Sequence, residues 1–319
     1  MIIKENPEDF VVKEILKLKG GNGKYAYFLM KKRNWNTLNA IEELSRRLRI
    51  PFKSFGYAGN KDKNAVTEQH ISMFNVTEDR VDWIRVKDIW LTFLGYGFEP
   101  ISLGSLEGND FEIVVKDIDG IGKIEFVANY FDEQRFSKNN IEIGKMIVKR
   151  QFKEMCKKLE LKVEKNDYIG TLRKLGIRRL QFYLHSYQSW LWNLVLSKHL
   201  EQFKHFKVKY SHGNFVFLHE RIKNIDLPLI NFNTKFKDKE IEKEYNEVMK
   251  KEGIGKVDFL IREIPELVTE GISRKAFIGV NWDSVGYDKE KREAKVKFYL
   301  PKGSYATIVL KKATNRKSF

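Results

Sequence analysis

Short runs in which apolar residues alternate with polar ones predict β-strands along the first part of the chain. The runs at 11–16 and 25–30 flank the glycine-rich segment 20–23, and we expect these three parts to form a β-hairpin. Further runs rich in β-branched and aromatic residues predict strands at 67–74, 89–96, 108–115, 215–218 and 293–300.

Apolar positions three and four residues apart predict helices elsewhere. The clearest case is 38–48, with Asn36 or Thr37 as its N-cap and Pro51 beyond its end. Other helical patterns lie at 81–85, 121–131, 141–159 and 177–200. The mixture of helices with antiparallel-looking strands, without an internal repeat, indicates an α+β fold.

The character of the sequence changes near residue 201. The stretch 201–278 holds a cluster of turn residues, a short strand and the highly charged run 237–251. Because the charges of this run have mixed signs, we interpret it as a solvated helix face rather than a track for phosphates. We expect 201–278 to form a smaller module, with 1–200 and 279–319 forming the main domain.

Basic residues outnumber acidic ones by 59 to 43, which gives a net charge of +16. A field of this sign suggests a polyanionic partner, although a lysine-rich composition can also be a habit of the host. Aromatic residues make up 13% of the chain and could stack on bases while Lys and Arg meet phosphates. The balance favours nucleic acid. A membrane surface is disfavoured, since no amphipathic helix has a continuous basic face.

Several classes of protein are disfavoured by what the sequence lacks. No apolar run is long enough to span a bilayer, and the N-terminus has no signal-peptide pattern. The single cysteine, Cys156, cannot form an internal disulfide or a cysteine-based zinc site. The histidines are scattered, and there is no P-loop or dinucleotide-binding glycine motif. We therefore expect a cytoplasmic protein without a metal site.

The stretch from Phe55 to His70 is the strongest candidate for a reactive site. Gly56 and Gly59 allow a sharp turn or a close approach to a ligand, and Asp62 is the one carboxylate in the middle of the loop. Enzymes often present a reactive group on such a loop, held by a rigid scaffold. The polar residues 60–64 are more typical of an ordinary turn, so this stretch alone favours the turn over a reactive site and the rest of the chain has to decide.

Six blocks in the sequence together resemble the TruD family of pseudouridine synthases, in the family's order. They are Lys4–Phe10, Gly59–Gln69, Gly108–Phe111, Asn129–Phe136, Tyr187–Asn193 and Leu300–Thr307. Coverage is weakest at 201–278, where the family carries a variable insertion. The chain departs from the family pattern at Asp132 and Ser137, where glycine is usual, and at the pair Lys311 and Lys312, where an Arg-Glu pair is common.

The resemblance implies a pseudouridine synthase catalytic domain at 1–200 and 279–319, with a mixed, mainly antiparallel sheet flanked by helices. It implies an α/β insertion domain at 201–278 that helps to enclose RNA. The implied reaction is the isomerisation of uridine in RNA, usually uridine 13 of tRNA, without a metal or an organic cofactor. Neither a membrane nor an obligate protein partner is expected.

By its position in the family motif, Asp62 is expected to be the catalytic carboxylate. Breaking the bond between C1′ and N1 leaves positive charge on the sugar, and a carboxylate can attack C1′ or take up a proton. Lys4, by family position, and Lys61, by sequence, are candidates for the cation beside it. Lys61 could equally contact a phosphate or be a solvated turn residue, and Lys4 without the resemblance would be interpreted as an exposed terminal lysine.

The base must leave its stack and be held in the site. By family position we expect Phe111 to stack on the base and Asn109 to bond the base or orient Asp62, with Phe10 and Tyr305 as further substrate contacts. Each aromatic residue is also a plausible core residue. Gln69, Gln134 and Arg135 are expected to brace the loop by hydrogen bonds, and Tyr187, Trp190 and Trp192 to pack in the core.

The alternative function is a non-catalytic RNA-binding or RNA-chaperone protein on the same scaffold. A DNA-binding protein is disfavoured, because there is no helix-turn-helix or zinc-finger pattern.

Overall fold

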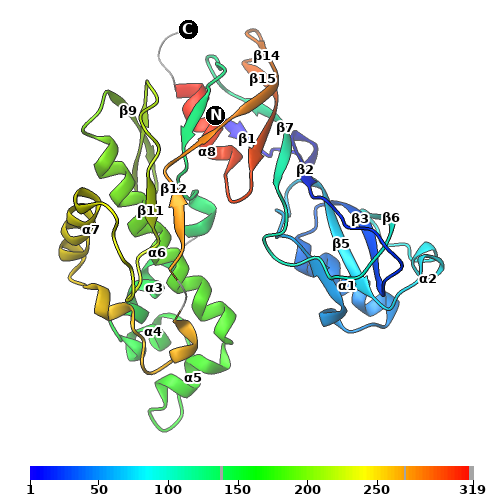
Figure 1. The fold of residues 1–319 in the computed structure, drawn as a ribbon, viewed down its shortest axis with the longest axis horizontal. Coiled ribbons are helices and arrows are strands. Elements are labelled where there is room, and N and C mark those ends of the chain that lie inside the picture. Colours follow the sequence, from blue (N-terminus) through cyan, green and yellow to red (C-terminus); the bar gives the residue numbers. More distant parts are fainter. Residues whose placement is uncertain (137–138, 269–270, 316–319) are drawn as a thin grey trace. The chain divides into compact units, whose positions relative to one another are not determined.

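The computed structural model describes residues 1–136, 139–268 and 271–315, and the chain divides into two compact units (Figure 1). One unit is Met1–Glu125 with Gly279–Phe319, and the other is Phe126–Ile278. The long helix α6 (Ile177–Leu200) belongs to the second unit, where it packs against elements on both sides of residue 201. The domain boundaries expected at 200/201 and 278/279 stay predictions.

The first unit is built on a mixed sheet. Its strand order is β14 (Asn281–Asp288), β15 (Glu293–Pro301), β7 (Gly108–Lys116), β2 (Phe10–Ile15), β5 (Val66–Phe74), β3 (Tyr25–Arg33) and β6 (Ile89–Gly97). The short strands β1 (Ile2–Ile3) and β4 (Phe55–Tyr57) add to β7 and β5. The pairing of β2 with β5 is parallel, whereas β2 with β7 and β5 with β3 are antiparallel.

The expected hairpin of β2 and β3 is wrong. Strand β5 lies between them, and the glycine-rich segment reaches the end of β6 instead. There Gly21 donates to the Tyr96 carbonyl over 2.8 Å, and a Cβ on Gly23 would lie 2.0 Å from the Gly97 oxygen. Because β5 pairs with β2 in parallel, the Asp62 loop that precedes β5 lies beside the start of β2.

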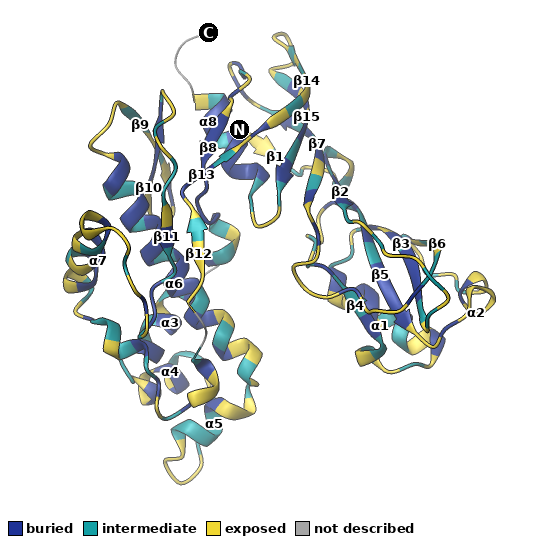
Figure 2. Cartoon of the chain, in the orientation of Figure 1, coloured by how far each residue is buried: buried dark blue, intermediate teal, exposed yellow. Residues whose placement is uncertain are grey.

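Helix α1 (Thr37–Leu48) covers one face of this sheet. Its N-cap is Asn36, which accepts from the Asn39 amide over 2.8 Å, as expected for this residue type. The buried face of α1 is dark blue in Figure 2. Its side chains Ala40, Ile41 and Leu44 form one core cluster with Phe28 and Met30 of β3 and with Ile71 and Met73 of β5. Each large apolar side chain buried in this way contributes about 1.5–3 kcal/mol, so this layer holds β3 and β5 in place.

The remaining elements of the first unit are short. They are α2 (Glu78–Asp82), α8 (Ala306–Asn315), and the single-turn helices η1 (Pro7–Asp9) and η2 (Phe52–Ser54). The helix expected at 81–85 is thus shifted toward the N-terminus.

The second unit is organised around α6, most of which is buried (Figure 2). Around it lie α3 (Asn140–Val148), α4 (Phe152–Lys158), α5 (Tyr168–Lys174), α7 (Lys239–Glu252), η3 (Glu133–Phe136), η4 (Lys256–Phe259) and η5 (Pro265–Leu267). Its strand pairs are β9 (His205–Tyr210) with β10 (Gly213–Leu218), β11 (Asp226–Pro228) with β12 (Ser273–Lys275), and β8 (Phe126–Ala128) with β13 (Phe277–Gly279). Tyr187 and Trp192 are fully buried, which confirms their packing role.

Two helix predictions in this region need correction. The pattern at 141–159 is two helices, because Arg150 between them adopts a left-handed conformation with φ of 56°. The segment 121–131 is not helical, since its centre is strand β8, where Phe126 packs edge-on against Phe277. Helix α7 matches the charged run, with Ile241, Tyr245 and Met249 on its buried face. In the described residues, no helix has the length and apolar character needed to cross a membrane.

Candidate active site

Asp62 lies in the loop between β4 and β5, close to the start of the chain. Its side chain is 44% exposed, and the Lys4 ammonium contacts its Oδ2 atom. Lys4 has a left-handed backbone with φ of 62°, and the Asn64 side chain donates to its carbonyl over 2.8 Å. The first residues of the chain and the Asp62 loop are therefore fastened together at two points, and a positive charge stands beside an accessible carboxylate.

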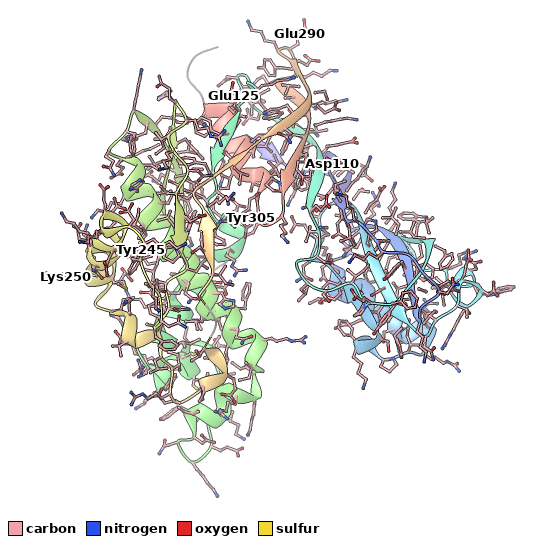
Figure 3. All side chains as sticks on the ribbon, viewed as in Figure 1. Asp110, Glu125, Tyr245, Lys250, Glu290 and Tyr305 are labelled. Atoms are coloured by element: carbon pink, nitrogen blue, oxygen red, sulfur yellow. The ribbon has the colours of Figure 1, made fainter. Side chains whose placement is uncertain are left out.

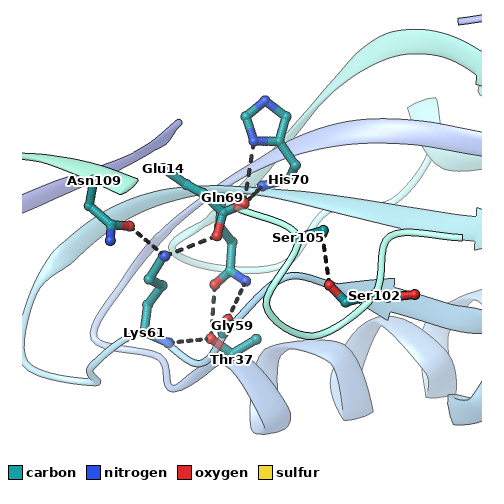
Figure 4. Close-up of polar contacts among 9 residues, drawn as sticks. All are labelled: Glu14, Thr37, Gly59, Lys61, Gln69, His70, Ser102, Ser105 and Asn109. Atoms are coloured by element: carbon teal, nitrogen blue, oxygen red, sulfur yellow. Dashed lines mark hydrogen bonds and ion pairs between the residues drawn. The ribbon is translucent and has the colours of Figure 1, made fainter. Parts of the chain in front are cut away.

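Lys61 points inward, into a buried network (Figure 4). Its ammonium lies 2.9 Å from Glu14 Oε2 and donates to Asn109 Oδ1 over 2.7 Å. The Lys61 side chain is 7% exposed and that of Glu14 is 0% exposed, so the interpretation of Lys61 as a solvated turn lysine is wrong. Lys61 ties the loop to β2 and β7 at once.

Glu14 is kept ionised by its neighbours. Burial acts to raise the pKa of Glu14, but hydrogen bonds from the side chain and backbone of His70 and the positive charge of Lys61 outweigh it and hold the pKa below its usual value. The His70 amide donates to Glu14 Oε1 over 3.0 Å. The result is a buried ion pair directly behind the loop.

A second set of bonds holds the loop from the side of α1. Thr37 Oγ1 accepts from the Lys61 amide over 2.8 Å and donates to Gln69 Oε1 over 2.8 Å. Gln69 in turn donates to the Gly59 carbonyl over 3.2 Å. Gln69, fully buried on β5, thus contacts the loop directly at Gly59 and through Thr37 at Lys61.

An aromatic cluster of Phe10, Phe111 and Phe298 lies beside Lys4. The Lys4 ammonium is 4.1 Å from the centre of the Phe10 ring. Phe10 meets Phe111 edge-on at 6.1 Å, and Phe111 stacks on Phe298 at 5.6 Å. Two of the three expected substrate aromatics, Phe10 and Phe111, are therefore packed within the sheet, on the side where Asn109 meets Lys61.

Asn109 is oriented by this arrangement. Because Lys61 donates to its Oδ1, Asn109 has its NH₂ group rather than its carbonyl to offer to a further partner. The seven expected site residues that this part of the first unit gathers are Lys4, Phe10, Lys61, Asp62, Gln69, Asn109 and Phe111.

Of three other expected site residues, one directly precedes α8 and two lie in the second unit. Tyr305 directly precedes α8, and its carbonyl accepts from the Ile308 amide over 3.1 Å (Figure 3). Arg135 and Gln134 lie on η3 in the second unit, where the Arg135 guanidinium is 5.7 Å from the Phe182 ring centre. Their roles as a substrate contact and as braces of the loop stay predictions. Ser137 lies outside the described residues.

Four contacts of this site were not predicted from the sequence. They are Glu14, Thr37, Phe298 and Lys32, whose ammonium donates to the Asp62 carbonyl. For Glu14 a signal was present: it follows Phe10 and Val12 at a spacing of two, so the alternation of β2 places it on the buried face. For Thr37 the sequence predicts only a role as a helix cap. Among the described residues, no group of three or more His, Cys, Asp or Glu side chains could hold a metal ion.

Comparison with known proteins decides the family. The family model described as tRNA pseudouridine synthase D (TruD) matches residues 1–162 and 153–313. The chain belongs to the TruD family. A tRNA pseudouridine synthase D from Aquifex aeolicus is 33% identical, and the match covers 97% of each chain. A relative from Thermococcus onnurineus, named as a probable tRNA pseudouridine synthase D, is 29% identical, and the match covers 97% of this chain and 93% of the relative.

The fold agrees with that of a TruD structure. A solved Methanosarcina mazei structure that carries the TruD name superposes with a TM-score of 0.69 at 26% identity, covering 98% of this chain and 93% of that one. The family resemblance and the α+β fold class expected from the sequence are both confirmed. The TruD match spans the two units, including the stretch 201–278 in which the sequence offered little to compare.

Proposed function

We propose that this TruD-family chain isomerises uridine to pseudouridine in tRNA, at uridine 13, with Asp62 as the catalytic carboxylate. The observation that carries the proposal is the state of Asp62: its carboxylate is accessible and paired with Lys4, while its neighbour Lys61 is buried and fixed. An accessible carboxylate on an immobilised loop is suited to act on a substrate atom.

The reaction is balanced within the nucleotide itself. The bond between C1′ and N1 breaks, the uracil turns, a bond forms between C1′ and C5, and the proton on C5 is released while N1 gains one. Asp62 can attack C1′ or remove a proton from the sugar, and a carboxylate can afterwards assist the loss of the C5 proton. No electron leaves the nucleotide, so the chemistry needs neither an oxidant nor a reductant.

The uracil is held by the residues around Asn109. The base must be extruded from the RNA and stacked. One face of the Phe111 ring already lies against Phe298, so the opposite face is the one that a base would meet. The NH₂ group of Asn109 donates to a uracil carbonyl in this arrangement. We include Phe10 and Tyr305 as further substrate contacts because they match substrate-pocket positions in the family motifs.

Lys4 is expected to act on catalysis more than on binding. Replacing it by methionine removes the charge beside Asp62, and a charge-assisted contact of this kind is worth about 1.5–3 kcal/mol, or about 10–100-fold in rate. Single-turnover rates and tRNA affinities measure the two effects separately. Lys13→Met is the control, since the exposed pair of Lys13 with Glu112 lies on the same sheet. Equal losses of rate in the two variants would contradict the role given to Lys4.

Binding of tRNA is expected to weaken steeply with salt. The net charge of +16 implies several contacts with phosphates, each of which releases counterions. Affinity for a tRNA transcript should fall at least about tenfold between about 50 and 200 mM salt. An affinity that does not change over this range of salt would contradict binding of tRNA through contacts of basic residues with phosphates.

One assay separates the proposed enzyme from the alternative, a non-catalytic RNA-binding protein. Formation of pseudouridine replaces the hydrogen on C5, so tRNA labelled with tritium at uridine C5 releases the label to water. The proposed function expects release by the purified protein. Binding of the tRNA without release would favour the non-catalytic alternative.

A further inference from the structure

Lys32, on β3, is the most unusual charged residue of the first unit. It is 0% exposed, although lysine is rarely buried without a partner of opposite charge. Its ammonium donates to two main-chain carbonyls, that of Trp35 over 2.6 Å and that of Asp62 over 3.2 Å. Among the residues that the structure describes, these two oxygens are the acceptors it reaches.

The surroundings of Lys32 do not favour its charge. Burial lowers its pKa to about 8; the negative charge of Asp62 works against this shift, and the positive charge of Lys61 adds to it. Its neighbours on the adjacent strands, Thr67 on β5 and Ile89 on β6, carry no charge. An apolar side chain of similar length would avoid the cost of burying an ammonium here, so stability alone does not explain a lysine.

Lys32 does contact the main chain of Asp62, the proposed catalytic residue. The Asp62 side chain is 44% exposed and pairs with Lys4. The contact of Lys32 with the Asp62 carbonyl fixes the same residue from behind and joins it to the turn at Trp35.

We infer that Lys32 is a positioning residue for Asp62, whose buried ammonium holds the Asp62 carbonyl so that the carboxylate is kept at its place beside Lys4. This inference rests on the proposed role of Asp62. Lys32 touches no substrate, since its side chain is enclosed. It acts on the reaction through the main chain of Asp62.

Lys32→Met tests the inference, with Lys31→Met as its matched control. Lys31 is the neighbouring residue on β3, is exposed, and pairs with Glu68. For Lys32→Met we expect the single-turnover rate at saturating tRNA to fall about tenfold or more, with tRNA affinity within about threefold of wild type. Thermal unfolding should stay within a few degrees of wild type, because the variant removes a buried charge. Lys31→Met should leave rate and unfolding unchanged.

The pH dependence adds a readout that a purely structural role would not move. As Lys32 loses its proton near pH 8, the wild-type single-turnover rate should decline, and the decline should be absent from Lys32→Met. The folded-state pKa lies below the unfolded value of 10.5, so the contribution of Lys32 to stability rises with pH over this window. Deprotonation of Lys32 therefore cannot cause the decline by unfolding the protein.

The outcomes separate the two proposals. A folded Lys32→Met variant with a rate within about twofold of wild type overturns the inference, provided that wild type is active and Asp62→Asn is not. If Lys32→Met does not fold, a wild-type rate that stays flat from about pH 7 to about pH 9 overturns it instead. Inactive wild type, or active Asp62→Asn, overturns the proposed function and this inference with it.

Discussion

Asp62→Asn is expected to abolish pseudouridine formation while leaving tRNA binding within about threefold of wild type. The substitution preserves the shape of the side chain and a hydrogen-bond acceptor for Lys4, but it removes the charge and the nucleophilic or basic oxygen. Because this oxygen is proposed to act on the reacting nucleotide, its loss should slow the chemical step by on the order of 10³-fold or more.

The measurement is the release of tritium from uridine C5 in single turnover, with tRNA affinity measured alongside. Asp110→Asn is the control, since Asp110 is an exposed carboxylate on β7 next to Asn109. It should behave as wild type. Residual activity of Asp62→Asn within about tenfold of wild type would show that another group carries the reaction.

Glu14→Gln is expected to destabilise the fold by about 3–5 kcal/mol, because it breaks a buried ion pair and leaves the other charge in place. The charge left behind is that of Lys61, whose side chain is only 7% exposed. The substitution should also disturb the Asp62 loop, since the Lys61 ammonium that loses Glu14 is the one that holds Asn109.

Denaturant unfolding measures this effect, and Glu112→Gln is the control. Glu112 pairs with Lys13 at 3.1 Å on the same sheet, but both side chains are partly exposed, so its loss should change the free energy of unfolding by at most about 1 kcal/mol. Similar losses in the two variants would contradict a buried role for Glu14.

The destabilisation should also depend on pH. The folded-state pKa of Glu14 lies below its usual value of 4.5, so its contribution to stability is present above that pH and is lost as the pH falls through the folded-state value. Wild type and Glu14→Gln should therefore converge in stability on acidification. A constant difference down to acid pH would contradict the ion pair as its source.

The spacing of apolar residues was sufficient to predict those helices and strands in which the buried residues recur at a regular interval. Strand β5 and helices α1 and α6 were predicted within a residue, because their apolar spacing is regular. The pairing of β2 with β5 was not predicted, since a strand's alternation does not say which strand lies beside it. The break at Arg150 was also hidden, because a left-handed residue there is not a glycine.

The site shows the same limit. Asp62 and Lys4 were found by family resemblance, but the contact between them joins residues 58 apart in sequence, and only the fold brings them together. Glu14 lay within reach of sequence reasoning through the alternation of β2. The same signal was present for Lys32, which follows Phe28 and Met30 at a spacing of two on β3, but the basic run of Lys31, Lys32 and Arg33 obscured it.

The central claim is that this chain converts a uridine of tRNA into pseudouridine through Asp62. The most direct test incubates an unmodified tRNA transcript with the purified protein and maps pseudouridine at each nucleotide, with Asp62→Asn in parallel. The account expects pseudouridine at uridine 13 with wild type and none with Asp62→Asn. A transcript that binds wild type and stays unmodified, or one that Asp62→Asn modifies as well, would contradict it.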